Sequence, residues 1–178
     1  MDGDQLRALQ APLKDRYRAE PEAALVTLSA TGELGEGVAC SVNTARAIAE
    51  AGLHPATGGD GSLLCSGDML LEALVACAGV TLRAVSTSLG ISVPAGRVRA
   101  EGDLDFRGTL GVEREAPVGF KEIRLSFELD TDAHEEQLAT LQKLTERYCV
   151  VYQTLAAGSA LTTSVSASDA LSRPRTGS

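Results

Sequence analysis

The chain has 178 residues, of which 44% are hydrophobic and 22% charged, a composition that suits one folded domain and excludes a disordered or collagen-like protein. It carries 24 acidic against 16 basic side chains, and the formal net charge of −8 argues against nucleic acid and anionic membranes as partners. Trp is absent, and three Phe and three Tyr are too few for platforms on which bases stack.

The N-terminal segment predicts a helical arm over residues 1–20. Apolar residues recur there at steps of three and four, at Leu6, Leu9, Leu13 and Tyr17. This spacing predicts a helix over 4–18 that is interrupted, or starts afresh, near Pro12. The segment lacks the basic flank and apolar run of a signal peptide, and no window reaches about 18 uninterrupted apolar residues. We therefore expect a cytoplasmic protein.

Two strands and a glycine-rich loop follow. Residues 24–30 and 38–44 read as strands joined by a turn over 31–37, which predicts a hairpin. The glycines and proline of residues 45–67 predict a long loop with one helical turn over Ala45–Ala51. Its GGDGS run lacks the lysine and the spacing of a phosphate-binding loop.

The most apolar segment of the chain predicts a buried central helix. It begins after Ser66, a plausible N-cap, and its apolar residues surround most of the helix before Gly90 ends it. Strands with period two are then expected over 98–108 and 120–130, followed by a helix over 133–148.

The C-terminal part predicts one more strand, over 160–167, and a polar tail over 169–178. Strands, a buried helix, further strands, a second helix and a strand make an α+β fold with helices on antiparallel sheet.

Four cysteines offer the clearest chemistry: Cys40, Cys65, Cys77 and Cys149. They form no CxxC pair and have no His at ligand spacing, so structural zinc is disfavoured and we expect no metal and no cofactor. In a reducing compartment such thiols are either buried packing residues or redox-active ones. We interpret Cys40 and Cys65 as packing residues, although Cys65 is also a possible disulfide partner for Cys77.

The two remaining thiols differ in setting. Cys77 lies in the middle of the apolar helix, where burial alone would raise its pKa. Cys149 follows the end of the second helix, and the negative end of a helix dipole disfavours a thiolate. Either could be a packing residue, and a reactive thiolate would require a cation from elsewhere.

Two motifs together carry a family resemblance. The stretch SGDMLLEALVACAGVTL, followed some seventy residues later by ERYCVVYQTL, resembles the OsmC/Ohr family of osmotically inducible and organic hydroperoxide resistance proteins. The order of elements agrees from about Ala24 to Ala167. The resemblance implies an OsmC-like domain over 21–168, with antiparallel sheets around a buried central helix in an intertwined homodimer.

The resemblance also implies an activity. Cys77 would be the thiolate that attacks an organic hydroperoxide, and Cys149 the thiol that resolves the resulting sulfenic acid to a disulfide. A dithiol reductant, possibly lipoyl-type, would reset the pair. The family's arginine, which holds the thiolate, corresponds by position to Arg46.

The sequence departs from the family pattern at two places. Ser66 and Gly67 stand where the family has Pro-Glu, so Asp68 or Glu72 would have to supply the carboxylate, although Asp68 is also explained as a first-turn acid that stabilises the helix. The family's Cys-Pro-Val segment is here Cys-Val-Val, beginning at Cys149.

Two other readings therefore stay open. The chain could be a non-catalytic dimer that binds an apolar small molecule, or an interaction protein whose arm, Leu6 to Tyr17, contacts a partner. His54, in the loop, is either a proton donor or a surface residue, and His134 is read as structural.

Overall fold

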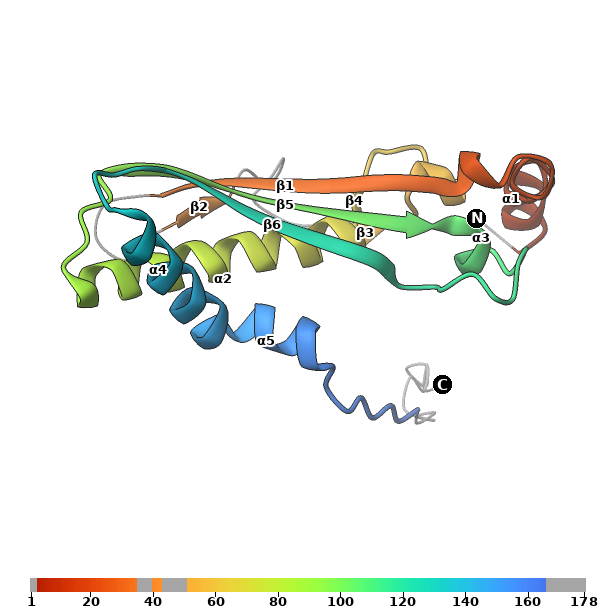
Figure 1. The fold of residues 1–178 in the computed structure, drawn as a ribbon. Coiled ribbons are helices and arrows are strands. Elements are labelled where there is room, and N and C mark those ends of the chain that lie inside the picture. The colour runs from red at the N-terminus through yellow and green to blue at the C-terminus, as the bar shows by residue number, and fades with distance from the viewer. Residues whose placement is uncertain (1–2, 35–39, 43–50, 166–178) are drawn as a thin grey trace, which may run out of the picture.

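The computed structural model describes residues 3–34, 40–42 and 51–165. They form an α+β fold in which helices cover one face of an antiparallel sheet (Figure 1), as predicted. The helices are α1 (Gly3–Ala19), α2 (Ser66–Leu89), α3 (Phe106–Thr109), α4 (Glu135–Tyr148) and α5 (Val150–Ala157). The strands are β1 (Leu25–Leu34), β2 (Cys40–Val42), β3 (Ala51–Gly52), β4 (Leu64–Cys65), β5 (Ala95–Asp105) and β6 (Phe120–Asp130). Short 3₁₀ turns lie at Pro21–Ala24 and Pro55–Thr57.

The main sheet has four strands in the order β2-β1-β5-β6, all antiparallel. The predicted hairpin is confirmed, because β1 pairs with β2, with Gly32 opposite Val42. β1 is longer than predicted and continues through residues 31–34, which sequence reasoning placed in the turn. The long pairing of β5 with both neighbours makes these three strands one continuous platform.

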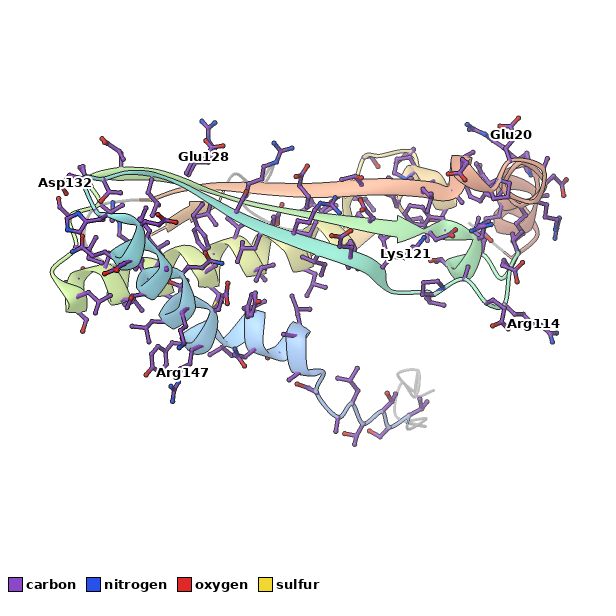
Figure 2. All side chains as sticks on the ribbon, viewed as in Figure 1. Glu20, Arg114, Lys121, Glu128, Asp132 and Arg147 are labelled. Atoms are coloured by element: carbon purple, nitrogen blue, oxygen red, sulfur yellow. The ribbon has the colours of Figure 1, made fainter. Side chains whose placement is uncertain are left out.

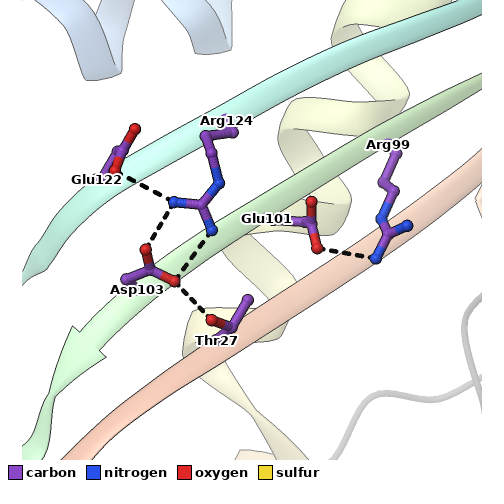
Figure 3. Close-up of polar contacts among 6 residues, drawn as sticks. All are labelled: Thr27, Arg99, Glu101, Asp103, Glu122 and Arg124. Carbon is purple, nitrogen blue, oxygen red and sulfur yellow. Dashed lines mark hydrogen bonds and ion pairs between the residues drawn. The ribbon is translucent and has the colours of Figure 1, made fainter.

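One face of this platform is polar and carries an ion-pair network (Figure 3). The Arg124 guanidinium lies 2.6 Å from Asp103 Oδ2, and the Thr27 hydroxyl donates to Asp103 Oδ1 at 2.6 Å. Beside them Arg99 pairs with Glu101 at 2.8 Å. These residues alternate with buried ones along β5, which is the period-two pattern of a half-exposed strand.

The opposite face packs on α2 and makes the core. Leu71, Leu74 and Val75 of α2 are at most 1% exposed, and they belong to one buried cluster with Val98 and Ala100 of β5. Burying one such aliphatic side chain stabilises the fold by about 1.5–3 kcal/mol, so α2 anchors the sheet. Gly90, at φ 66°, takes the left-handed conformation that ends the helix, as predicted.

By length and mean hydropathy alone, α2 is also the one helix among the described residues that could cross a membrane. The core helix of a globular domain passes the same test, and α2 buries Leu71, Leu74 and Val75 in the cluster that it shares with the sheet. Its N-cap position is Cys65 rather than Ser66, with no side-chain capping bond.

The N-terminal helix α1 packs on the rest of the chain. It runs through Pro12 without the predicted break. Tyr17 is only 2% exposed, and its hydroxyl donates to the carbonyl of Ala56 at 2.7 Å. Gln10 donates to the carbonyl of Thr57 at 3.2 Å. These contacts hold the residues of the proposed arm against the 3₁₀ turn at Pro55–Thr57.

Two predictions need correction. The loop over 45–67 contains β3 and β4, which pair in parallel, so the smaller sheet is not antiparallel. The predicted helical turn over Ala45–Ala51 lies mainly outside the described residues. The strand expected over 160–167 is absent from its described part, 160–165, which has no partner strand. The chain forms α5 before it instead.

Candidate active site

The candidate site lies where α5 meets the middle of α2. Cys77 is partly buried on α2, and Cys149, 0% exposed, lies between α4 and α5. α4 and α5 lie on the same side of the sheet as α2 (Figure 1). In Figure 2 Glu128 projects from the opposite side of the sheet and Arg147 projects away from it, so these labelled charges lie away from the space between α2 and the sheet.

Cys149 is both the C-cap of α4 and the N-cap of α5. Its N–H donates to the Thr145 carbonyl at 2.9 Å, which completes α4. Its φ and ψ of −73° and 109° are extended, and its Sγ accepts the N–H of Tyr152 at 3.4 Å, which caps α5. This extended residue separates α4 from α5 and places its thiol at the start of α5.

The structure brings Cys77 and Cys149 together as free thiols in direct contact. The backbone N–H groups of Val150 and Val151, the Cys149 thiol and the Thr81 hydroxyl act on the Cys77 sulfur in the sense that lowers its pKa. Burial by itself raises the pKa of Cys77, and these donors outweigh burial, so that pKa lies below its ordinary value.

Cys149 shifts in the opposite direction. Burial raises its pKa to about 11, and its hydrogen bond to Cys77 and the charge of that sulfur act in the same sense. The pair therefore loses its first proton from Cys77 and keeps the other on Cys149. A thiolate facing a protonated thiol is the arrangement that a nucleophile and its disulfide partner require.

The predicted carboxylate Asp68 is not among the groups that act on Cys77. It lies nine residues earlier on α2, about two and a half turns, which places it on the opposite side of the helix. Burial raises the pKa of Asp68, and the charge of His54 opposes this shift. Burial and the charge of Asp68 raise the pKa of Glu72. Asp68 thus interacts with His54 and with Glu72, and not with Cys77.

His54 itself is partly buried rather than a surface residue. Its ring stacks on Phe106 with centroids 4.9 Å apart, and its Nδ1 accepts the N–H of Ala56 at 3.0 Å. These contacts account for the position of His54 as a packing residue. His134 precedes α4, where its N–H donates to the Gln137 side chain at 3.1 Å, in agreement with a structural role.

Arg46, the predicted cation, lies outside the described residues, as does the side chain of Cys40. Cys65 is a free, partly buried thiol that packs against the core at the start of α2. Within residues 3–34, 40–42 and 51–165, no three His, Cys, Asp or Glu side chains gather in a way that could hold a metal ion.

A mainly apolar cavity of about 710 Å³ lies between β6, α4 and α5, and neither Cys77 nor Cys149 lines it. Leu74 and Leu82 line it from α2. Phe127 lines it from β6, and Tyr152 and Leu155 line it from α5. Tyr152 connects the two features, because it lines the cavity while its N–H donates to Cys149 Sγ.

Sequence reasoning missed α5 and, with it, the donors on Cys77. The segment after Cys149 reads as an apolar stretch, since Val150 and Val151 are β-branched. The signal that could have revealed a helix is Gly158, which follows eight residues after Val150 and ends α5.

Comparisons with known proteins agree with this architecture. Residues 59–164 match the family model of the OsmC-like proteins. The fold is similar to the crystal structure of an OsmC-like hydroperoxide resistance protein from Jannaschia sp. CCS1, with a TM-score of 0.59 and 16% identity over 82% of this chain and 96% of that one. It is also similar to an OsmC-like protein from Mycoplasma pneumoniae, with a TM-score of 0.53 and 16% identity over 75% of this chain and 86% of that one.

No curated protein sequence matches the chain. The family match covers more than half of the 178 residues and includes α2, the sheet strands β5 and β6, and both helices that flank Cys149. The chain belongs to the OsmC-like family.

Proposed function

We propose that the protein is a thiol-dependent peroxidase that reduces organic hydroperoxides with Cys77 and Cys149. The observation that carries the proposal is the contact between two free thiols whose pKa values move in opposite directions, downward for Cys77 and upward for Cys149. Membership of the OsmC-like family and the hydroperoxide resistance of the Jannaschia neighbour support this choice of substrate.

In the proposed reaction the Cys77 thiolate attacks the terminal oxygen of the hydroperoxide. The O–O bond breaks, the alkoxide leaves and takes up a proton as the alcohol, and Cys77 becomes a sulfenic acid. The Cys149 sulfur then attacks the Cys77 sulfur, water leaves, and a disulfide forms. An external dithiol returns both cysteines to thiols and is itself oxidised to a disulfide.

We further propose that the working unit is a homodimer. α2 leaves apolar side chains exposed, Leu70 at 37% and Val80 at 38%, on the side of the helix that carries Cys77. Val150, beside Cys149, is 71% exposed. A second copy over this face would cover the apolar side chains and exclude water from the thiol pair.

The test is a count of free thiols after cumene hydroperoxide is added to the reduced protein. We expect the wild type to lose two of its four thiols, Cys77→Ser to lose none, and Cys149→Ser to lose one as a sulfenic acid that dimedone traps. Cys65→Ser is the matched control and should consume peroxide like the wild type. Four unreacted thiols in the wild type, or full peroxide consumption by Cys77→Ser, would contradict the proposal.

The cavity favours a second candidate function, a non-catalytic dimer that binds an apolar small molecule. A space of about 710 Å³ with aliphatic and aromatic walls suits such a ligand. Native mass spectrometry of the same preparation, before peroxide is added, distinguishes the two: a co-purified ligand together with four unreactive thiols supports binding. The mass of the assembly in the same spectrum tests the dimer.

A further inference from the structure

The helix α1 is hydrogen-bonded to the 3₁₀ turn at Pro55–Thr57. Two carbonyls of this turn accept from α1: that of Ala56 accepts from the Tyr17 hydroxyl at 2.7 Å, and that of Thr57 accepts from Gln10 Nε2 at 3.2 Å. Tyr17 is 2% exposed and Thr57 is 5% exposed, so these contacts lie at a buried interface. Because hydrogen bonds weaken steeply when distance and angle change, the docking of α1 depends on the conformation of the turn.

His54 fixes the conformation of this turn. Its Nδ1 accepts the N–H of Ala56 at 3.0 Å, which caps the turn, and its carbonyl accepts from the N–H and the hydroxyl of Thr57 at 2.8 and 2.9 Å. The ring stacks on Phe106, which is only 3% exposed, at 4.9 Å and an interplanar angle of 14°. Ala56 therefore links the two sides of the interface, since its N–H binds the His54 ring and its carbonyl binds the Tyr17 hydroxyl.

The cap exists only while Nδ1 of His54 carries no proton. A ring nitrogen that accepts an N–H must present a lone pair, so the neutral ring has its proton on Nε2. The protonated ring has an N–H on both nitrogens, and Nδ1 then faces the N–H of Ala56 as a second donor. Histidine is the side chain that ordinarily takes up a proton between about pH 5 and 8. A modest fall in pH therefore converts the acceptor of this cap into a donor.

The charged groups around His54 give the protonated ring another partner. On α2 the charge of His54 acts on the Asp68 carboxylate, and Glu72, one turn later, interacts with Asp68. The charged side chains next to the interface on the other two elements are already paired: Arg107 of α3 with Asp105 at 2.5 Å, and Arg16 and Arg18 of α1 with Glu20 at 3.9 Å and Asp15 at 2.7 Å. A cationic ring is therefore attracted towards α2 and away from the turn.

We propose that His54 is a pH-sensitive latch for α1. The neutral ring caps the turn and holds in place the carbonyls that α1 binds, whereas the protonated ring releases the N–H of Ala56 and turns towards Asp68, which loosens α1. Leu13 and Tyr17 pack in the same buried cluster as Phe106, so the loosened form exposes apolar surface that the latched form covers. The latch lies outside the thiol pair and does not depend on the peroxidase proposal.

The experiment is hydrogen–deuterium exchange of the full chain, read by mass spectrometry at about pH 7.5 and about pH 5.5 and corrected for the intrinsic effect of pH. In the wild type, residues 3–19 should exchange about two- to tenfold faster at the lower pH, the effect of one hydrogen bond, while residues 95–105 should not change. His54→Asn keeps an acceptor for the N–H of Ala56 and does not titrate, so α1 should exchange slowly at both pH values. His54→Phe keeps the stacked ring without an acceptor, so α1 should exchange fast at both.

Two results would overturn the latch. The first is wild-type exchange over residues 3–19 that does not respond to pH. The second is an equal response in the wild type and His54→Asn, because Asp68, Glu72 and the other histidine of the chain, His134, are still present in that variant. If His54→Phe does not fold, the comparison of the wild type with His54→Asn decides alone. Acceleration that extends to residues 95–105 would report a global loss of stability and would also count against the latch.

Discussion

The outer face of the sheet and the helix junction both lower the pKa of an acid, but by different means. On the sheet, hydrogen bonds from Arg124 and Thr27 hold the pKa of Asp103 at about 2 in an exposed network (Figure 3). At the junction, neutral donors lower the pKa of Cys77 against the effect of burial. Exposed ion pairs are screened by salt, whereas donors without a net charge offer no charge for salt to screen. We therefore expect the pKa of Cys77 to depend less on ionic strength than the ion pair of Asp103.

The largest expected effect is the difference in reactivity between the two site thiols. The pKa of Cys77 lies below its ordinary value and that of Cys149 is about 11, so their thiolate fractions near neutral pH differ by more than about a hundredfold. Iodoacetamide should therefore alkylate Cys77 first, as peptide mass spectrometry would show. The rate should rise with pH through the Cys77 pKa and then level off. Faster labelling of Cys149 would reverse the proposed roles.

A smaller effect is expected when salt screens the ion pair of Asp103, measured as a change in the free energy of unfolding. Because the pKa of Asp103 is lowered on folding, its stabilisation is complete above the unfolded pKa of about 3.9 and is lost as the pH falls towards 2. The substitution Asp103→Asn should remove that acid dependence, and its small effect on stability at neutral pH should fade as added salt screens the pair. Urea unfolding at low and high salt measures this.

The same salt series sharpens the comparison with the junction. The thiolate titration of Cys77 should shift far less with salt than the stability difference between Asp103→Asn and the wild type. A Cys77 pKa that moved strongly with salt would instead show that a charge in the protein, rather than uncharged donors, lowers it.

The smallest effect is expected at Asp68. Because this carboxylate lies across α2 from Cys77 and interacts with His54 and Glu72, the substitution Asp68→Asn should leave the Cys77 titration unchanged. Burial raises the pKa of Asp68, so its ionised form opposes folding at neutral pH, and the amide should unfold at equal or higher urea concentration. Loss of the Cys77 thiolate in this variant would restore the role that the sequence predicted for Asp68.

Much of the fold was predictable because its elements have strong local patterns. The period-two alternation around Val98 and Ile123 gave β5 and β6, and the apolar run closed by Gly90 gave α2. The strand expected over 160–167 is rich in β-branched residues, but its described part, 160–165, has no partner strand and so no ladder to stabilise it. Propensity was overridden there by the absence of tertiary pairing.

The site was predictable only in part. The resemblance singled out Cys77 and Cys149, but their contact depends on packing between α2 and α5, which local periodicity cannot report. The extended backbone of Cys149 separates α4 from α5. Sequence reasoning therefore placed this thiol at the end of the first helix and missed that a second helix begins there. The role of Arg46 remains a prediction.

One departure from the family pattern has a direct physical consequence. Val150 stands where the resemblance places a proline, and unlike proline it has an N–H to donate.

The junction between α4 and α5 has an optical consequence. The protein has no Trp and three Tyr, and two of these, Tyr148 and Tyr152, flank Cys149. The third, Tyr17, is held far along the chain against the turn at Ala56. Ultraviolet emission from the protein therefore comes largely from rings beside the thiol that proposed turnover would oxidise. Under the proposed function, the tyrosine fluorescence should therefore change when a disulfide forms between Cys77 and Cys149.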